Sequence, residues 1–89
     1  MFRLPETSDK SFGEYVKVFR KENGLRARDL AQLMLKKNNI DWRDDLMLVE
    51  CIQGRIYRWE TLNGSPKPWD LKMLARVMGV TVDFLMVFF

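Results

Sequence analysis

The chain has 89 residues, a formal net charge of +3, one cysteine and no histidine. This length predicts a single small domain whose apolar residues suffice for one core. Without histidine the chain lacks the usual general base and the commonest zinc ligand, and a lone cysteine cannot form an internal disulfide. The acidic residues are scattered or stand beside basic ones at helical spacing. We therefore expect no enzymatic activity, no metal site and no cofactor.

Charged residues interrupt every apolar stretch before the roughly eighteen residues that a membrane span needs. The first residues are too few and too soon polar for a signal peptide, so we expect a cytoplasmic protein with no membrane contact. The mild net charge permits nucleic-acid binding without requiring it. Basic residues gather in 26–37 and 51–59, whereas residues 41–50 hold four acids and one base.

Residues 1–10 contain several turn formers and predict an N-terminal arm, with residues 11–89 forming the domain. A first helix should start near Ser11 and end at Asn23-Gly24. Its apolar residues recur at helical spacing: Phe12, Tyr15, Val16 and Phe19. A second helix should come next, at about 27–37. Its buried face would be Leu30, Ala31, Leu33 and Met34.

Residues 42–62 also carry apolar side chains at helical steps, and Asp41 can cap a helix that starts there. Gly54 is the only local sign of a break in this segment. The sequence therefore leaves two alternatives open, which are one long helix or two short helices that meet near Gln53-Gly54.

Four residues of this segment have structural interpretations. Ile56 and Trp59 should lie in the core, and Cys51 should be a small buried apolar residue. Glu60 should be structural, paired with an arginine such as Arg20.

Residues 63–66 predict a loop, and two further helices should lie at about 69–78 and 82–87. Three residues fit the ends of these helices: Pro68 in a first turn, Gly79 at a positive φ after a last turn, and Thr81 as an N-cap. The apolar residues of the first of them share one face: Leu71, Leu74, Ala75 and Met78. No segment shows the alternation of a strand.

Several phrases of the chain match a known family. The last third carries Leu74-Ala75, Gly79-Val80, Thr81-Val82-Asp83 and Phe84-Leu85. Earlier phrases are Arg20 to Leu25, Leu30-Ala31 and Ile56 to Glu60. With these motifs the chain resembles the phage-repressor and Cro family, the xenobiotic-response-element type, over about 12–34 and 52–87. The resemblance implies an all-α, compact five-helix lambda-repressor-like domain, prokaryotic or phage-encoded.

The chain departs from the family pattern at two places. About fifteen extra residues, roughly 35–49, separate the two helices of the motif, and we expect an extra helical insertion at about 38–50. The family's glutamine at the start of its second helix is replaced by Ala27, which cannot position a phosphate. Arg26 and Arg28 could contact phosphates instead, as charges at a helix N-terminus.

The resemblance implies sequence-specific binding of double-stranded DNA by a repressor-like transcription regulator, with segment 53–58 in the major groove. The positions that would read bases are Gln53, Gly54, Arg55, Tyr57 and Arg58. Phosphate contacts would come from Arg26, Arg28 and the loop from Asn63 to Lys67. Tyr57 could instead have a packing role. Trp69 should cover the last loop, with a DNA-backbone contact as the alternative.

The apolar C-terminus predicts a homodimer on a palindromic operator, with Val87, Phe88 and Phe89 in or beside a two-fold interface. The alternative is a tail that folds back over Trp69 or over the arm around Phe2 and Leu4. A second function also stays open. If the acidic residues 41–50 cover the basic face, the fold would serve as a protein-interaction module, such as an antitoxin-like or anti-repressor partner, bound through the insertion.

Overall fold

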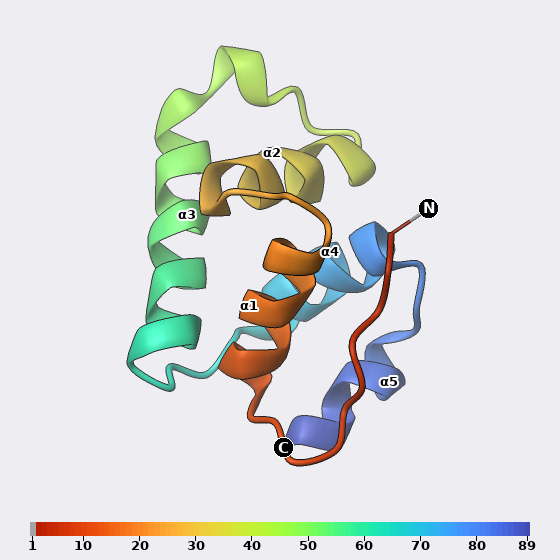
Figure 1. Ribbon diagram of the computed structural model, residues 1–89. Coiled ribbons are helices and arrows are strands. Elements are labelled where there is room, and N and C mark those ends of the chain that lie inside the picture. The colour runs from red at the N-terminus through yellow and green to blue at the C-terminus, as the bar shows by residue number, and fades with distance from the viewer. Residues whose placement is uncertain (1) are drawn as a thin grey trace.

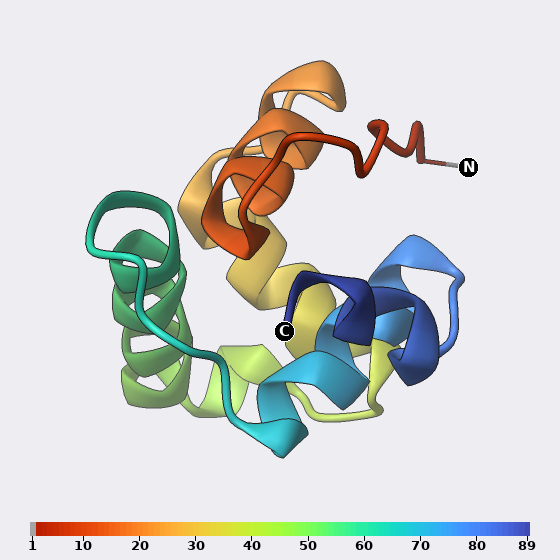
Figure 2. The ribbon, with the colours of Figure 1, turned by 90° about the horizontal axis from the view of Figure 1, so that it is seen from below.

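The computed structural model describes residues 2–89, and of Asp44 only the backbone. Within that range the chain is all-α and contains no strand. Its elements are α1 (Phe12–Glu22), α2 (Ala27–Lys37), the 3-10 turn η1 (Trp42–Asp44), α3 (Leu46–Thr61), α4 (Pro68–Met78), α5 (Val82–Leu85) and the 3-10 turn η2 (Met86–Phe88). In Figure 1 α3 stands along one side with α1 and α2 beside it, and α4 packs against α2. Figure 2 shows α1 and α4 on opposite sides of the molecule.

Polar side chains fix the starts of the helices. Thr81 Oγ1 accepts the Phe84 N–H at 3.2 Å, which confirms its predicted role as an N-cap. Ser11, near which the first helix was expected to start, accepts the Glu14 N–H at Oγ at 3.2 Å. Gly79 ends α4 with a φ of +73°, which confirms its expected role. Asp45, for which the sequence pattern predicted no role, caps α3 by accepting the Leu48 N–H at 3.0 Å.

The segment 46–61 is one helix, which decides between the two alternatives that the sequence left open. Gly54 lies inside it without breaking it. The residues at which we expected an insertion, about 38–50, form a short loop, η1 and the first residues of α3. At 16 residues, α3 is about 24 Å long, with roughly 1.5 Å of rise per residue.

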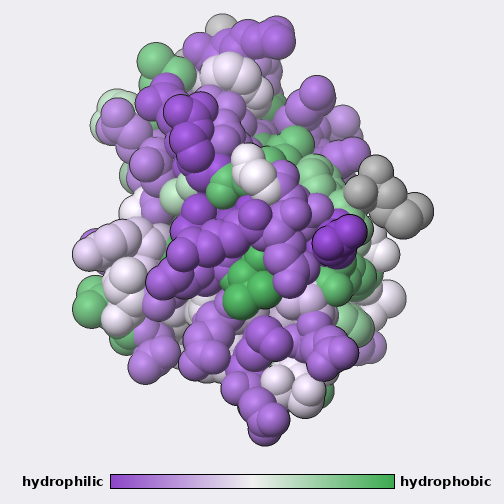
Figure 3. Space-filling view, in the orientation of Figure 1, coloured by the Kyte–Doolittle hydropathy of each residue, from purple (hydrophilic) through white to green (hydrophobic). Residues whose placement is uncertain are grey.

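The predicted apolar stripes meet in one core between the helices. Ile56 and Trp59 are buried there, as expected, whereas Leu33 is only half-buried. Cys51 is exposed, so its predicted burial is wrong. It adjoins the buried Ile52, but one helical step turns it to the outer face of α3. The face of the molecule in Figure 3 is mostly hydrophilic, with small apolar areas between the polar side chains.

Among the contacts between α1 and α3, two lie near opposite ends of α1. The side chains of Arg20 and Glu60 form the ion pair that the sequence predicts, with Nη2 and Oε1 2.6 Å apart. Near the other end of α1, the helices touch at Gly13, where an added Cβ would overlap the Trp59 carbonyl oxygen. Only glycine permits this approach.

Both ends of the chain pack on α1. The Phe2 ring lies 5.6 Å from that of Phe19, so the N-terminal arm runs along the domain. The Phe88 ring lies 4.9 Å from Tyr15, and Phe89 lies 5.4 Å from Phe12. The tail thus folds back, but onto α1. Val87 remains 64% exposed. Among residues 2–89 no helix has the length and apolar character needed to span a bilayer.

Candidate nucleic-acid interface

The start of α2 and the middle of α3 enclose a shallow hollow, which we call the α2–α3 hollow. Its volume is about 510 Å³. Its lining residues are Arg28 from α2 and Glu50, Gln53, Gly54 and Tyr57 from α3. Four of these five were predicted from the sequence as DNA-binding residues. The fold therefore brings a cation at a helix start together with polar groups on the facing helix.

The outer face of α3 is a continuous exposed stripe. It lies opposite the core positions Val49, Ile52, Ile56 and Trp59. Its members recur at helical spacing: Met47, Glu50, Cys51, Gly54, Tyr57, Arg58 and Thr61. Met47 is 77% exposed and Tyr57 62%. A Cβ added at Gly54 would meet no atom within 4 Å beyond the neighbouring backbone of its own helix, so the middle of the stripe is open.

Arg55 differs from its neighbours because its guanidinium is engaged inside the protein. Its Nε and Nη2 donate to the same oxygen of Asp70, at 3.0 and 2.7 Å. Asp70 is 1% exposed, and its second oxygen accepts the Lys67 N–H at 3.0 Å. Arg55 thus holds the start of α4 against α3. In the sequence, the only feature that points to this pair is Asp70 itself, an acidic residue at the third position of α4.

The two arginines at the start of α2 also differ. Arg26 donates from Nε and Nη2 to Asp29, at 3.0 and 3.1 Å. These hydrogen bonds lower the pKa of the Asp29 carboxyl. Among the side chains that the structure describes, none forms an ion pair with Arg28, which lines the α2–α3 hollow. Arg28 is therefore the cation at this helix start that is available to a ligand.

Arg58 and the loop after α3 complete the predicted set. The Arg58 side chain is exposed, and its carbonyl oxygen accepts the Leu62 N–H at 2.9 Å and the Gly64 N–H at 3.1 Å. These bonds fold the loop back on α3. Asn63 adopts a positive φ of 52° there, and its side chain is exposed, as is that of Lys67. Neither residue lines the α2–α3 hollow.

The segment before α3 contacts both the start of α3 and a part of α2 outside the α2–α3 hollow. Trp42 of η1 is half-buried and lines a hollow with Leu33 and Lys36. Of the acidic side chains that the structure describes in 41–50, only Glu50 lines the α2–α3 hollow. Glu50 was not predicted as a site residue, because the sequence did not place the start of α3 at Leu46.

No protein-family model, curated protein or solved structure matches this chain. The structure and the sequence motifs are therefore the grounds for any function proposed.

Proposed function

We propose that this protein binds double-stranded DNA sequence-specifically and regulates transcription, with α2 and α3 as a lambda-repressor-like helix-turn-helix pair. One observation carries the proposal, which is the convergence of Arg28, Gln53, Gly54 and Tyr57 on one exposed hollow. A major groove is wide enough to admit an α-helix, and its base edges offer donors and acceptors to such side chains.

Each residue of this face has a role that its chemistry suits. Gln53 can form two hydrogen bonds with adenine, and Arg58 can do so with guanine. Arg28 stands at the N-terminus of α2, where the helix dipole adds to its attraction for a phosphate. Tyr57 can reach sugar or phosphate. Gly54 lets the α3 backbone approach the base edges.

The length of α3 decides how it would enter the groove. Family members that insert the tip of the recognition helix read bases from its first turn. Here two turns precede Gln53, and the tip carries the apolar, exposed Leu46 and Met47. These apolar side chains would form no favourable contact with the charged phosphates. We therefore propose that α3 lies lengthwise, so that Met47 and Cys51 face apolar groups such as thymine methyls.

We also propose a two-fold dimer through the C-terminus. Met86, Val87 and Phe89 leave apolar surface exposed at one end of the molecule. Phe88 is half-buried and packs on Tyr15, so it would support the interface from within the protomer. Val87 would form the centre of the interface. A domain this small makes few base contacts, and a dimer doubles them on a palindromic operator.

One observation favours a protein ligand at the same hollow. Glu50 places a carboxylate in the same hollow as Arg28. A carboxylate repels phosphates unless it accepts a hydrogen bond, for example from cytosine. The neighbouring Tyr57 and Met47 are exposed and suit a protein partner. An antitoxin-like or anti-repressor role is the second candidate function.

Selection from a library of random DNA duplexes separates the two candidates. The wild-type protein should enrich a short motif, arranged as two half-sites with two-fold symmetry. The double variant Gln53→Ala/Arg58→Ala, which changes no core residue, should enrich none. Sequences no different from the starting library with the wild type would contradict DNA binding.

A further inference from the structure

The outer face of α4 forms a second hollow, which we call the α4 hollow, with a volume of about 560 Å³. The end of α2 and the turn between α4 and α5 complete its walls. No residue lines both this hollow and the α2–α3 hollow. The two hollows are therefore separate surfaces, and the ligand of one need not be the ligand of the other.

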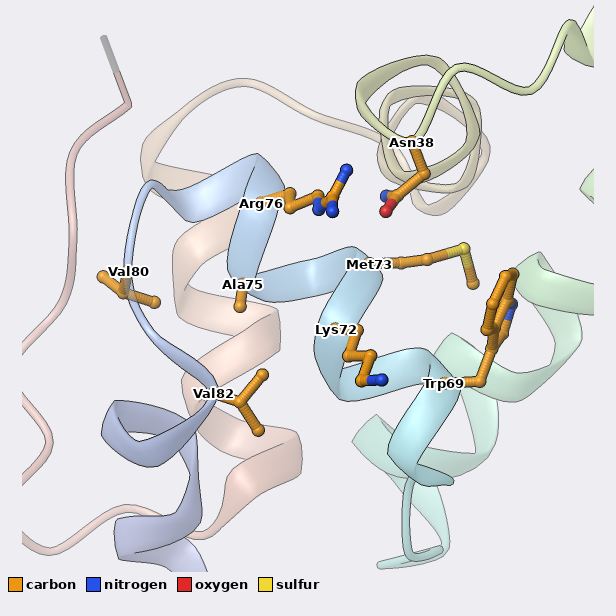
Figure 4. A pocket seen from close by; sticks show the side chains of 8 residues that line it. All are labelled: Asn38, Trp69, Lys72, Met73, Ala75, Arg76, Val80 and Val82. Atoms are coloured by element: carbon orange, nitrogen blue, oxygen red, sulfur yellow. The ribbon is translucent and has the colours of Figure 1, made fainter.

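One aromatic ring and two cations dominate the α4 hollow. Trp69, Lys72 and Arg76 stand at i, i+3 and i+7, so they share the exposed face of α4. Trp69 is 57% exposed. Figure 4 shows its indole at one end beside Met73, while the Arg76 guanidinium points toward Asn38.

The charge of this surface is unopposed. No acidic residue whose side chain the structure describes lines the α4 hollow. Within the part of the chain that the structure describes, neither Lys72 nor Arg76 forms an ion pair. A ligand that complements the surface must therefore carry negative charge opposite these two side chains.

Apart from Asn38, the remaining residues that line the α4 hollow are apolar, which narrows the class of ligand. Val80 and Val82 are half-buried and close one side of the α4 hollow, as Figure 4 shows. A nucleic-acid backbone carries a charge at every phosphate and offers these valines no apolar partner. A peptide with carboxylates spaced between aliphatic or aromatic side chains satisfies both the cations and the valines. Tryptophan and arginine are also the residue types that most often dominate protein–protein binding energies.

We propose that the α4 hollow binds an acidic, partly apolar segment of a partner protein. Its carboxylates bind Lys72 and Arg76, and an apolar side chain packs on Trp69. The geometry is that of a rigid helix face presented to a peptide, with the anchors held in place by the α4 backbone.

Selection from a library of displayed random peptides tests this proposal. The immobilised baits are the wild type, the variant Lys72→Glu/Arg76→Glu, and the control Lys17→Glu/Lys21→Glu. All four side chains are exposed, and the control pair lies on α1. Wild type and control should enrich peptides that combine acids with apolar residues. Those peptides should bind the α4 variant at least about tenfold more weakly. Enriched peptides without acids, or with equal affinity for all three baits, would overturn the proposal.

A second measurement locates the binding. The strongest selected peptide should shift the backbone amide signals of α4 and residues 80–82 in nuclear magnetic resonance spectra, and Trp69→Ala should weaken it. Shifts confined to α3 would refute the assignment. A random-sequence DNA duplex that shifts the α4 signals, and loses affinity with Lys72→Glu/Arg76→Glu, would show instead that nucleic acid occupies this face.

Discussion

Arg20 and Glu60, which are 40 residues apart in the chain, form two parallel hydrogen bonds of 2.7 and 2.6 Å. The Glu60 carboxylate is only 5% exposed. Arg20 also donates from Nη1 to the Leu25 carbonyl oxygen at 3.1 Å. One side chain therefore joins the end of α1, the turn before α2 and the last turns of α3, and fixes α2 and α3 relative to each other.

Replacing the carboxylate should cost much of the stability. Glu60→Leu leaves the Arg20 guanidinium without its charged partner in a mostly buried place. We expect the free energy of unfolding to fall by about 3 kcal/mol, because the remaining charge stays uncompensated. Urea denaturation measures this. Arg26→Ala, which removes an exposed pair, is the control and should move the midpoint little. Equal effects of the two variants would show that the Arg20–Glu60 pair is not structural.

Arg55 and Arg58, one helical turn apart, should give opposite phenotypes. Arg55→Ala leaves the buried Asp70 carboxylate without its charged partner and should lower the free energy of unfolding by about 2 to 3 kcal/mol. Arg58→Ala should leave stability unchanged and weaken binding to the selected duplex by about 1 to 3 kcal/mol. Urea denaturation and fluorescence anisotropy separate the two. An Arg55→Ala protein as stable as wild type but unable to bind DNA would show that Arg55 reads bases itself.

Two glycines should respond oppositely to the same substitution. Gly13→Ala forces α1 away from the Trp59 carbonyl and should cost about 3 kcal/mol or more. Gly54→Ala adds a methyl group in open space inside a helix and should stabilise the protein by about 0.5 to 1 kcal/mol. Thermal and urea unfolding report both. A destabilised Gly54→Ala would mean that α3 bends at this residue.

Much of the fold could be predicted from the sequence. Helix ends depend on local chemistry, so Ser11, Gly79 and Thr81 could be assigned from their residue types and positions. Helical spacing placed Ile56 and Trp59 in the core. Residue type alone is less reliable, because Cys51, expected to be buried as a small apolar residue, lies exposed on the outer face of α3.

Other features depend on the packed structure. Gly54 costs a helix only about 1 kcal/mol, and burial of Ile52 and Ile56 on either side outweighs that. The Arg55–Asp70 pair requires the loop after α3 to fold back before the two residues meet. No local sequence pattern specifies the path of that loop. The family resemblance therefore assigned Arg55 to base reading.

The exposed tail predicts a charge-sensitive dimer. Val87→Asp adds a charge at the proposed two-fold interface, where desolvating it is costly, and should shift the protein to monomer. Analytical ultracentrifugation measures the mass. Leu62→Asp, which places the same charge on an exposed residue after α3, is the control and should leave the dimer intact. A wild-type protein that sediments as a monomer, with and without DNA, would contradict the dimer.

The most direct test of DNA binding by α3 is the affinity of Gly54→Glu for the selected duplex, measured by fluorescence anisotropy over a salt series. A glutamate fits the open space at Gly54 and favours the helix, so the variant should fold. We predict that wild type binds with a logarithmic salt slope of about 0.9 per phosphate contacted. Gly54→Glu should show no specific binding, because its side chain and charge block the groove-facing stripe. Equal binding by both proteins, or a flat salt dependence of the wild type, would contradict DNA binding through α3.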